Sequence, residues 1–262
     1  MSELPLVSVL FVTYNRAELL ARTVHSFLQH TKYPQLELVV TDDASTPHAR
    51  RAITQLPFHV FVLADENRGL GANLNAGLRR CSGRYILVLQ DDWDCVAPPD
   101  YLRNAIAVMQ ENPQIAFINF YGVQHEIAGT PLPGSDEACH EIVDEFFDGE
   151  RYWPVYTDTP HVVAADAVRC LGYYREGCRM EQCELDYAAR FAAQREFRAA
   201  LFPAYYNRAF LHTGEQQSFR TRTVRHRVET WLHPYGRALK RRCPFLYVPS
   251  RSLVRGLIDL IG

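Results

Sequence analysis

The feature that most constrains the fold is an alternation of short apolar runs and amphipathic helical patterns over the first 120 residues. The apolar runs predict strands at Val7–Val12, Leu36–Thr41, Phe58–Leu63, Arg84–Leu89 and Ile115–Phe120. The intervening patterns predict helices after Asn15, which is a candidate N-cap, at Gly69–Arg80 and at Pro98–Glu111. Such alternation is typical of parallel βαβ units, whose right-handed crossovers bring the carboxyl ends of the strands to one edge.

The second half of the chain is less regular. Residues 121–160 are rich in loops, and further strands are predicted at Val162–Ala165 and Phe197–Phe202, with a helix at Glu181–Gln194. The predicted fold class is therefore α/β, with a sheet flanked by helices.

Polar residues follow four of the predicted strands. They are Thr13–Arg16, Asp42–Ser45, Asp65–Arg68 and Gln90–Asp94. Because ligands of open α/β sheets bind outside the carboxyl ends of the strands, these residues are expected to converge on one site.

Three carboxylates, Asp91, Asp92 and Asp94, stand where a buried strand stops. Such acids repel one another unless a cation lies among them. Hard divalent ions such as Mg²⁺ and Mn²⁺ take oxygen ligands and commonly bind together with the phosphates of a substrate. The alternative is a solvated turn with acidic caps for the following helix.

Four successive stretches, VSVLFVTYNR, LVVTDDAST, ENRGLGANLNAG and GRYILVLQDDW, resemble the landmarks of family 2 glycosyltransferases with the GT-A fold. The resemblance implies a Rossmann-like mixed sheet for nucleoside-diphosphate sugars. It implies a GT-A domain over 1–218, with a nucleotide-binding half at 1–120 and an acceptor-binding half at 121–218. A basic, helical extension would follow at 219–262.

The resemblance also implies residues that hold the nucleoside and diphosphate of a UDP- or GDP-type donor. They are Thr13, Tyr14, Arg16, Asp43, Arg68 and Asp91. For Asp43 the alternative is an Asx cap of a turn, and for Arg68 it is an ordinary surface position. Asn75 matches the family's asparagine and is expected to fix local geometry.

The expected metal ligands for Mn²⁺ or Mg²⁺ are Asp92 and His212, again by resemblance. Gln90 stands where the family usually has its first acid, so the site carries one charge fewer there. Asp94 is kept as a second candidate ligand, because Asp92 and Asp94 together form a literal DxD.

Transfer in the family inverts the anomeric carbon and needs a carboxylate that removes a proton from the acceptor hydroxyl. The stretch MEQCELDYAAR places Glu184 at that position, with Glu181 one helical turn away as the alternative. An acidic first turn stabilised by the helix dipole explains the same residues without catalysis. Tyr152, Trp153 and His161 are expected either to border the acceptor or to form a buried aromatic cluster.

From Gly214 onward the chain has ten Lys or Arg against three Asp or Glu. This basic tail suits an anionic membrane surface, and its alternatives are a helix that covers the sheet or a homodimer contact. Nucleic acid is not an expected partner, because no recognition motif accompanies the charge.

Seven cysteines, an odd number without a CxxC motif, indicate free thiols in a reducing compartment. No run approaches the ~20 apolar residues of a membrane-spanning helix. The expected location is cytoplasmic, or peripheral on the inner face of the cell membrane.

The sequence thus predicts a metal-dependent inverting glycosyltransferase that acts on a hydroxyl of a glycan or lipid-linked glycan in polysaccharide or glycolipid assembly. Two alternatives remain open: a sugar-phosphate nucleotidyltransferase and a non-catalytic binder of sugar nucleotides. The first lacks the usual early glycine-rich loop, and the second is suggested by Gln90 and by the incomplete acidic motif near Glu184.

Overall fold

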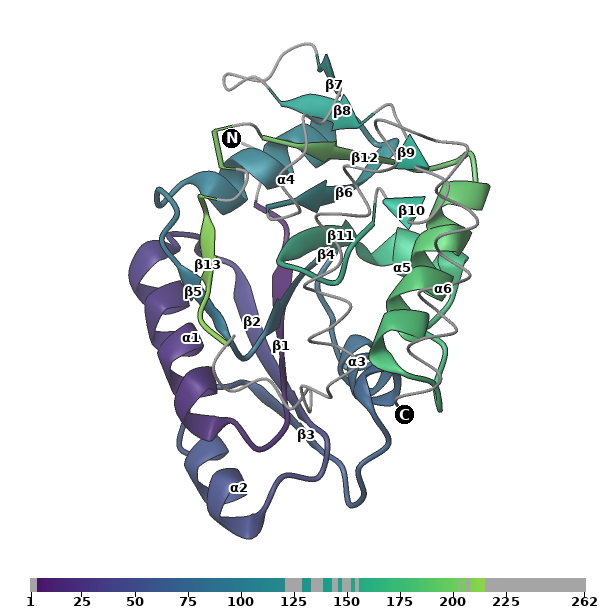
Figure 1. Cartoon of the computed structure of the whole chain (residues 1–262). Coiled ribbons are helices and arrows are strands. Elements are labelled where there is room, and N and C mark those ends of the chain that lie inside the picture. The colour runs from purple at the N-terminus through teal and green to yellow at the C-terminus, as the bar shows by residue number, and fades with distance from the viewer. Residues whose placement is uncertain are drawn as a thin grey trace, which may run out of the picture. The chain divides into compact units, whose positions relative to one another are not determined.

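A nine-stranded mixed sheet with helices on both faces forms the centre of the protein in the computed structural model (Figure 1). The structure describes residues 4–120, 129–132, 139–142, 146–147, 152–153, 156–202, 204–205 and 208–214. In sheet order the strands are β3 (Val60–Leu63), β2 (Leu36–Asp42), β1 (Val7–Thr13), β4 (Tyr85–Gln90), β11 (His161–Ala164), β6 (Ile115–Asn119), β12 (Arg198–Leu201), β8 (His140–Ile142) and β7 (Gly129–Pro131).

Two buried clusters hold the helices to the sheet. On one face lie α1 (Ala17–His30), α2 (Pro47–Ile53) and α4 (Tyr101–Glu111), and on the other lie α3 (Leu70–Leu78), α5 (Ala165–Leu171) and α6 (Met180–Ala193) (Figure 1). The first cluster contains Phe27 and Leu102, and the second contains Leu74 and Tyr187. The central strands have nearly continuous apolar sequences because helices cover both of their faces.

The carboxyl ends of the parallel strands lie level with one another. In the register of the sheet, Thr13 is opposite Asp42, and Val12 is opposite Gln90. The expectation that the polar residues after these strands converge on one edge is therefore confirmed for β1, β2 and β4.

One strand, β11, runs against its neighbours. It is antiparallel to both β4 and β6, so that His161 lies opposite Val88 on one side and Asn119 on the other. The segment that leads into β11 consequently reaches the same edge at which β4 ends.

A two-stranded ribbon, β5 (Trp93–Cys95) with β13 (Phe210–His212), continues from the acidic stretch. The pairing sets His212 opposite Trp93. It thereby carries a residue from near the end of the described chain to the acids that follow β4. A second short ribbon joins β9 (Phe146–Phe147) and β10 (Tyr152–Trp153).

The prediction that Asn15 caps α1 is wrong. The N-cap is Arg16, and Asn15 lies just before it with a φ of 55°. The Asn15 side chain instead accepts a hydrogen bond from Thr46 N at 2.8 Å, and its N–H donates to Ser45 Oγ at 2.7 Å. Asparagine tolerates the left-handed region, so here it ties the loop after β1 to the loop after β2.

The compact unit that contains the sheet ends at Gly214. The predicted basic extension, 219–262, lies outside the described residues. Within the described part, all six cysteines are free thiols, as predicted, and no helix has the length and apolarity needed to cross a membrane.

Candidate active site

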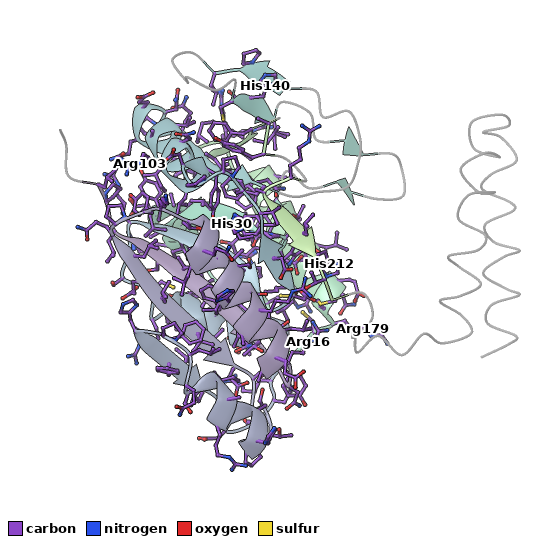
Figure 2. The ribbon with its side chains drawn as sticks, turned by 90° about the vertical axis from the view of Figure 1, so that its left-hand side faces the viewer. Arg16, His30, Arg103, His140, Arg179 and His212 are labelled. Carbon is purple, nitrogen blue, oxygen red and sulfur yellow. The ribbon has the colours of Figure 1, made fainter. Side chains whose placement is uncertain are left out.

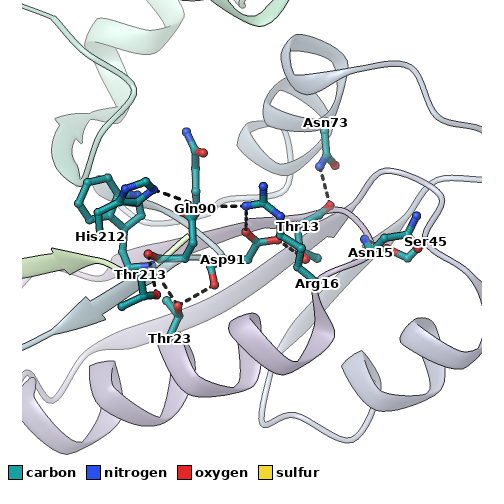
Figure 3. Close-up of polar contacts among 12 residues, drawn as sticks. Thr13, Asn15, Arg16, Thr23, Ser45, Asn73, Gln90, Asp91, His212 and Thr213 are labelled. Atoms are coloured by element: carbon teal, nitrogen blue, oxygen red, sulfur yellow. Dashed lines mark hydrogen bonds and ion pairs between the residues drawn. The ribbon is translucent and has the colours of Figure 1, made fainter. Parts of the chain in front are cut away.

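Two buried acids, Asp91 and Asp92, form the centre of the site at the end of β4. Their exposed fractions are 4% and 5%. Thr13 donates from Oγ1 to Asp91 Oδ2 at 2.7 Å, and Thr23 of α1 donates from Oγ1 to the Asp91 carbonyl at 2.9 Å (Figure 3). The end of β1 and the helix that follows it therefore hold the acidic turn in place.

Arg16 bridges the two acids. Its Nη1 lies 3.1 Å from Asp91 Oδ1 and 2.8 Å from Asp92 Oδ2. His212 approaches Asp92 Oδ2 from the other side, with Nε2 at 3.4 Å, and its ring packs against Trp93 with the centroids 4.7 Å apart. Arg16 and His212 come from opposite ends of the described chain yet lie close together (Figure 2).

The two acids differ in their affinity for a proton. Burial raises the pKa of Asp91 to about 6, against the lowering effects of the Thr13 hydrogen bond and the Arg16 charge. Burial also opposes ionisation of Asp92, but the hydrogen bond and charge of His212, together with Arg16, outweigh it, so that the pKa of Asp92 is lowered. Asp92 is thus the acid that stays ionised down to lower pH, as a metal ligand must.

The surroundings of Asp92 fit a divalent cation. Its Oδ1 is buried without a hydrogen-bond partner in the described structure. A Cβ placed on Gly214 would lie 2.0 Å from Asp92 Oδ2, so only glycine leaves room for the carboxylate there. No group of three or more His, Cys, Asp or Glu in the described residues forms a complete metal site. One carboxylate and one imidazole would therefore need phosphate oxygens to complete the coordination.

Asp94, the second candidate ligand, points to a different partner. It forms an ion pair with Arg22 of α1, whose side chain is 60% exposed. The other oxygen of Asp94, Oδ1, is buried and lacks a partner among the described residues. Asp94 therefore stays a candidate that a direct comparison with Asp92 can test.

Asp43 and Asp42 organise the loops around the site. Asp43 accepts backbone N–H groups of Arg68 and Gly69, each at 2.8 Å, one on each carboxyl oxygen. Asp42 is fully buried, accepts from Ser45 and pairs with Arg50 Nε at 3.0 Å. Asp42 thus caps its own turn, whereas Asp43 ties the loop after β2 to the residues that begin α3, and each Asp43 oxygen keeps a second lone pair for a nucleobase.

Arg68 and Asn75 meet at Glu176. The Arg68 guanidinium, 59% exposed, pairs with Glu176 at 2.9 Å. Asn75 is buried, exchanges two hydrogen bonds with the backbone of Tyr174 at 2.8 and 2.9 Å, and donates to Glu176 at 2.9 Å. Asn75 was expected to fix the geometry of a strand and its loop, but it instead joins α3 to the loop before α6.

Glu184, the candidate base, lies half-buried on α6 and accepts a hydrogen bond from Asp158 N at 3.2 Å. Asp158 in turn contacts Gln90, which directly precedes the acid pair: Gln90 Nε2 lies 3.3 Å from Asp158 Oδ2. This chain of contacts connects Glu184 with the edge that holds Asp91 and Asp92. Glu181, in the first turn of the same helix, is exposed.

His161 belongs to the buried aromatic cluster. It is 1% exposed, and its ring lies 4.7 Å from Phe117 and 5.2 Å from Tyr156, measured between centroids. Of its two expected settings, the core is therefore the observed one. Tyr152 and Trp153 form β10, and their side chains lie outside the described structure.

Sequence reasoning missed three contributors to the site: Thr23, Asp158 and Gly214. A threonine inside a helix and a glycine after a strand carry no distinctive pattern. Asp158 precedes a strand instead of following one, so only the antiparallel direction of β11 brings it to the site. Tyr14, which was predicted to hold the nucleoside, is 36% exposed beside Asn15.

Comparisons with known proteins bear on the family and the fold of the chain. A sequence model of glycosyl transferase family 2 matches residues 8–161. The chain is 33% identical over 135 residues to the putative teichuronic acid biosynthesis glycosyltransferase TuaG of Bacillus subtilis. The matched stretch covers 49% of this chain and 51% of that protein. It is 25% identical over 124 residues to the GalNAc(5)-diNAcBac-PP-undecaprenol beta-1,3-glucosyltransferase of Campylobacter jejuni, covering 45% and 38%. The chain thus spans only 51% and 38% of the length of these two relatives.

Solved structures show the same fold at low identity. The mannosyltransferase PcManGT from Pyrobaculum calidifontis, in complex with GDP-Man and Mn²⁺, superposes with a TM-score of 0.57 at 20% identity, covering 91% of this chain and 65% of that one. TarS of S. aureus, residues 1–349 in complex with UDP-GlcNAc, gives a TM-score of 0.56 at 19% identity, covering 77% and 58%.

Proposed function

Because the chain belongs to glycosyl transferase family 2, we propose that it transfers a sugar from a nucleoside-diphosphate sugar to an acceptor hydroxyl. Its sheet has the GT-A architecture that the sequence resemblance predicted. The donor is of the UDP or GDP type, the kinds held by the structural neighbours TarS and PcManGT. The acceptor is a glycan or lipid-linked glycan in polysaccharide or glycolipid assembly, in line with the names of the relatives.

The observation that carries this proposal is the acid cluster at the end of β4. Asp92 keeps an ionised carboxylate with one unpartnered, buried oxygen, and His212 stands 3.4 Å from its other oxygen. These two residues would hold Mn²⁺ or Mg²⁺, which stabilises the departing diphosphate as a Lewis acid when bound. Arg16, already 2.8 Å from Asp92, is within reach of the same phosphate oxygens and suits them with its guanidinium fork.

The remaining residues bind and orient the donor. Asp91, fixed by Thr13, faces the ribose and diphosphate, and Asp43 offers its remaining lone pairs to an N–H of the base. Arg68, whose exposed guanidinium pairs with Glu176, would exchange this partner for phosphate. Tyr14 completes the nucleoside side of the site.

Proton removal is assigned to Glu184, and the reaction inverts the anomeric carbon. An acceptor oxygen forms the new bond to that carbon while the bond to the diphosphate oxygen breaks, and the hydroxyl proton passes to Glu184. The contact of Glu184 with Asp158, and of Asp158 with Gln90, favours Glu184 over the exposed Glu181.

The test is the release of nucleoside diphosphate from a panel of UDP-, GDP- and TDP-sugars with Mn²⁺, with and without hydroxyl acceptors. We expect one donor to be turned over, and excess EDTA to abolish the reaction. Pyrophosphate release from a nucleoside triphosphate and a sugar phosphate would instead identify a nucleotidyltransferase. A sugar nucleotide that binds but is never turned over with any acceptor would identify a non-catalytic binder.

For the basic tail at 219–262, the proposal is peripheral attachment to the anionic inner face of a membrane, because its cations alternate with apolar residues. The triple change Lys240→Glu, Arg241→Glu and Arg242→Glu should abolish co-sedimentation with phosphatidylglycerol vesicles. Equal binding of both proteins to these vesicles, or a shift from dimer to monomer in the variant, would favour a dimer contact.

A further inference from the structure

Asp158 lies between the end of β4, which carries the acid pair, and α6, which carries Glu184. It lies three residues before β11, and because β11 is antiparallel to β4, this segment comes level with the end of β4. The residue therefore faces Gln90 from β4 and Glu184 from α6, although these are 68 and 26 residues away in sequence.

The contacts on Asp158 are polar and directional. Gln90 Nε2 lies 3.3 Å from Asp158 Oδ2 and 3.4 Å from the Asp158 carbonyl oxygen. One side-chain amide therefore contacts both the carboxyl group and the backbone of Asp158. On the other side, Asp158 N donates to Glu184 Oε1 at 3.2 Å. The Asp158 side chain also has a hydrogen bond with Glu184, so the two carboxyl groups are neighbours, and the neutral Gln90 amide fixes that of Asp158.

No cation neutralises this pair in the described part of the structure. The groups that act on Asp158 are Gln90 from β4, with Glu184 and the Cys183 thiol from α6. His161 of β11 turns its Nδ1 to the Thr159 carbonyl, and burial lowers the pKa of His161 to about 4, so it is neutral. Burial raises the pKa of the Cys183 thiol to about 12, so that group is neutral as well.

Two carboxylates in contact cannot both stay ionised without a nearby positive charge, so one keeps a proton. Burial, and then the charge of Glu184 together with a side-chain hydrogen bond to it, raises the pKa of Asp158 well above its ordinary value. Asp158 is thus a carboxyl whose environment favours the protonated form.

We propose that Asp158 is a positioning residue for Glu184, a protonated carboxyl that donates a hydrogen bond to the base and holds it ready for the acceptor hydroxyl. The proposal rests on the assignment of Glu184 as the base. With the Asp158 N–H and O–H both donated to it, the Glu184 carboxylate keeps free lone pairs for the incoming proton. During transfer the acceptor O–H bond breaks and its proton moves to Glu184, while Asp158 keeps its own.

The same arrangement accounts for Gln90, which stands where the family usually has an acid. An acid at position 90 would add a second negative charge beside Glu184 and would offer no N–H to Asp158. The Gln90 amide instead donates a hydrogen bond to Asp158 Oδ2, and the departure from the family pattern becomes part of the positioning of the base.

The kinetic test compares Asp158→Asn with Asp158→Ala on the donor that the wild type turns over. An asparagine keeps a neutral donor at this place, so we expect kcat at pH 7 to stay within about threefold, whereas alanine should lower kcat about tenfold or more with an unchanged donor KM. The wild-type kcat should fall where rising pH ionises Asp158, and this limb of the pH profile should be absent from Asp158→Asn. Asp186→Asn, which removes an acid of the same helix that pairs with Arg190, is the control and should match the wild type.

Equal losses in Asp158→Asn and Asp158→Ala would overturn the proposal, because they would mean that Asp158 acts through its negative charge. A limb of the pH profile that persists in Asp158→Asn would also overturn it. Full activity in Glu184→Gln would instead refute the assignment of the base in the proposed function.

A second measurement does not depend on turnover. The carboxyl ¹³C resonance of Asp158 should titrate well above the ordinary pH range of an aspartate in the wild type, and its midpoint should fall in Glu184→Gln, where the neighbouring charge is gone. A wild-type midpoint near pH 4 would refute the shared proton, whether or not the protein transfers sugars.

Discussion

At the scale of single residues, Asp92 contacts several neighbours through its Oδ2 and its backbone carbonyl. Arg16 and His212 contact one of its oxygens, Thr213 donates its N–H to the Asp92 carbonyl at 2.8 Å, and Gly214 lies against the carboxylate. Such close packing fixes the direction of a carboxylate that is proposed to meet a cation and a diphosphate.

The approach of Gly214 leads to a prediction. In Gly214→Ala, the new Cβ would lie 2.0 Å from Asp92 Oδ2 and must displace the carboxylate. We expect the affinity for nucleoside diphosphate with Mn²⁺, measured by calorimetry, to fall about tenfold or more, because about 1.4 kcal/mol of misplaced contact suffices for that.

The matched control is Gly172→Ala at the end of α5, where the nearest atom to a new Cβ is Arg190 Nη1 at 3.7 Å. Because Gly172 has a φ of +80°, this variant should lose stability but keep the nucleotide affinity. Unchanged affinity in Gly214→Ala would show that Asp92 is not held as described.

The convergence of the polar residues that follow the parallel strands was predictable from the sequence, because the carboxyl ends of parallel strands lie at one edge of the sheet. Arg16 was predicted to hold the nucleoside, whereas the structure shows its guanidinium on Asp91 and Asp92. Side-chain reach of this kind is set by the packing of neighbouring elements, and no spacing in the chain encodes it. Asp158 was missed because the direction of β11 is a property of the sheet.

At the scale of elements, α3 joins the two halves of the described structure. Asn75 connects this helix to Tyr174 through a reciprocal pair of hydrogen bonds, and Gly71 packs so closely that a Cβ would lie 2.3 Å from the Arg175 carbonyl. The loop before α6, and with it the position of Glu184, therefore depends on α3.

Asn75→Ala should destabilise the fold by about 2–4 kcal/mol, because it leaves the buried N–H and C=O of Tyr174 without their partners. Urea unfolding measures the change. The control is Arg79→Ala at the C-cap of α3. The exposed Arg79 guanidinium lies 3.7 Å from Glu176 and 4.3 Å from the centroid of the Tyr173 ring, and its loss should cost less than about 1 kcal/mol. Equal effects of the two variants would mean that the Asn75 hydrogen bonds do not hold the loop.

Strands and helices were predictable at this scale where apolar periodicity was strong. The run Val7–Val12 became β1, and Glu181–Gln194 differs from α6 by one residue at each end. The ribbon of β5 and β13 was not predicted, because two three-residue strands have no periodicity to detect. The prediction that Asn15 caps α1 is wrong because its side chain accepts a hydrogen bond from the backbone N–H of Thr46 instead.

At the scale of the whole molecule, the aromatic cluster behind β11 links the sheet with α6. Phe117, Tyr156, Tyr187 and Phe191 pack together with His161 among them. The fold thus buries a titratable ring in its core, which makes its stability depend on pH.

Burial lowers the pKa of His161 to about 4, compared with about 6.5 in an unfolded chain. The folded state therefore binds fewer protons between these values, and its stability should fall by up to about 3 kcal/mol as the pH drops from 6.5 to 4. In His161→Gln this part of the acid dependence should disappear from urea unfolding at a series of pH values. His25→Gln, an exposed histidine on α1, is the control, and an identical slope in wild type and His161→Gln would contradict the account.

In the proposed reaction, Asp92 holds a divalent ion together with the diphosphate of a nucleotide. The most direct test of this role is calorimetric binding of UDP and GDP, with and without Mn²⁺, to the wild type, Asp92→Asn and Asp94→Asn. The account predicts that Mn²⁺ tightens the preferred nucleotide about tenfold or more in the wild type and in Asp94→Asn, and leaves its affinity unchanged in Asp92→Asn. A full manganese-dependent gain in Asp92→Asn would contradict it.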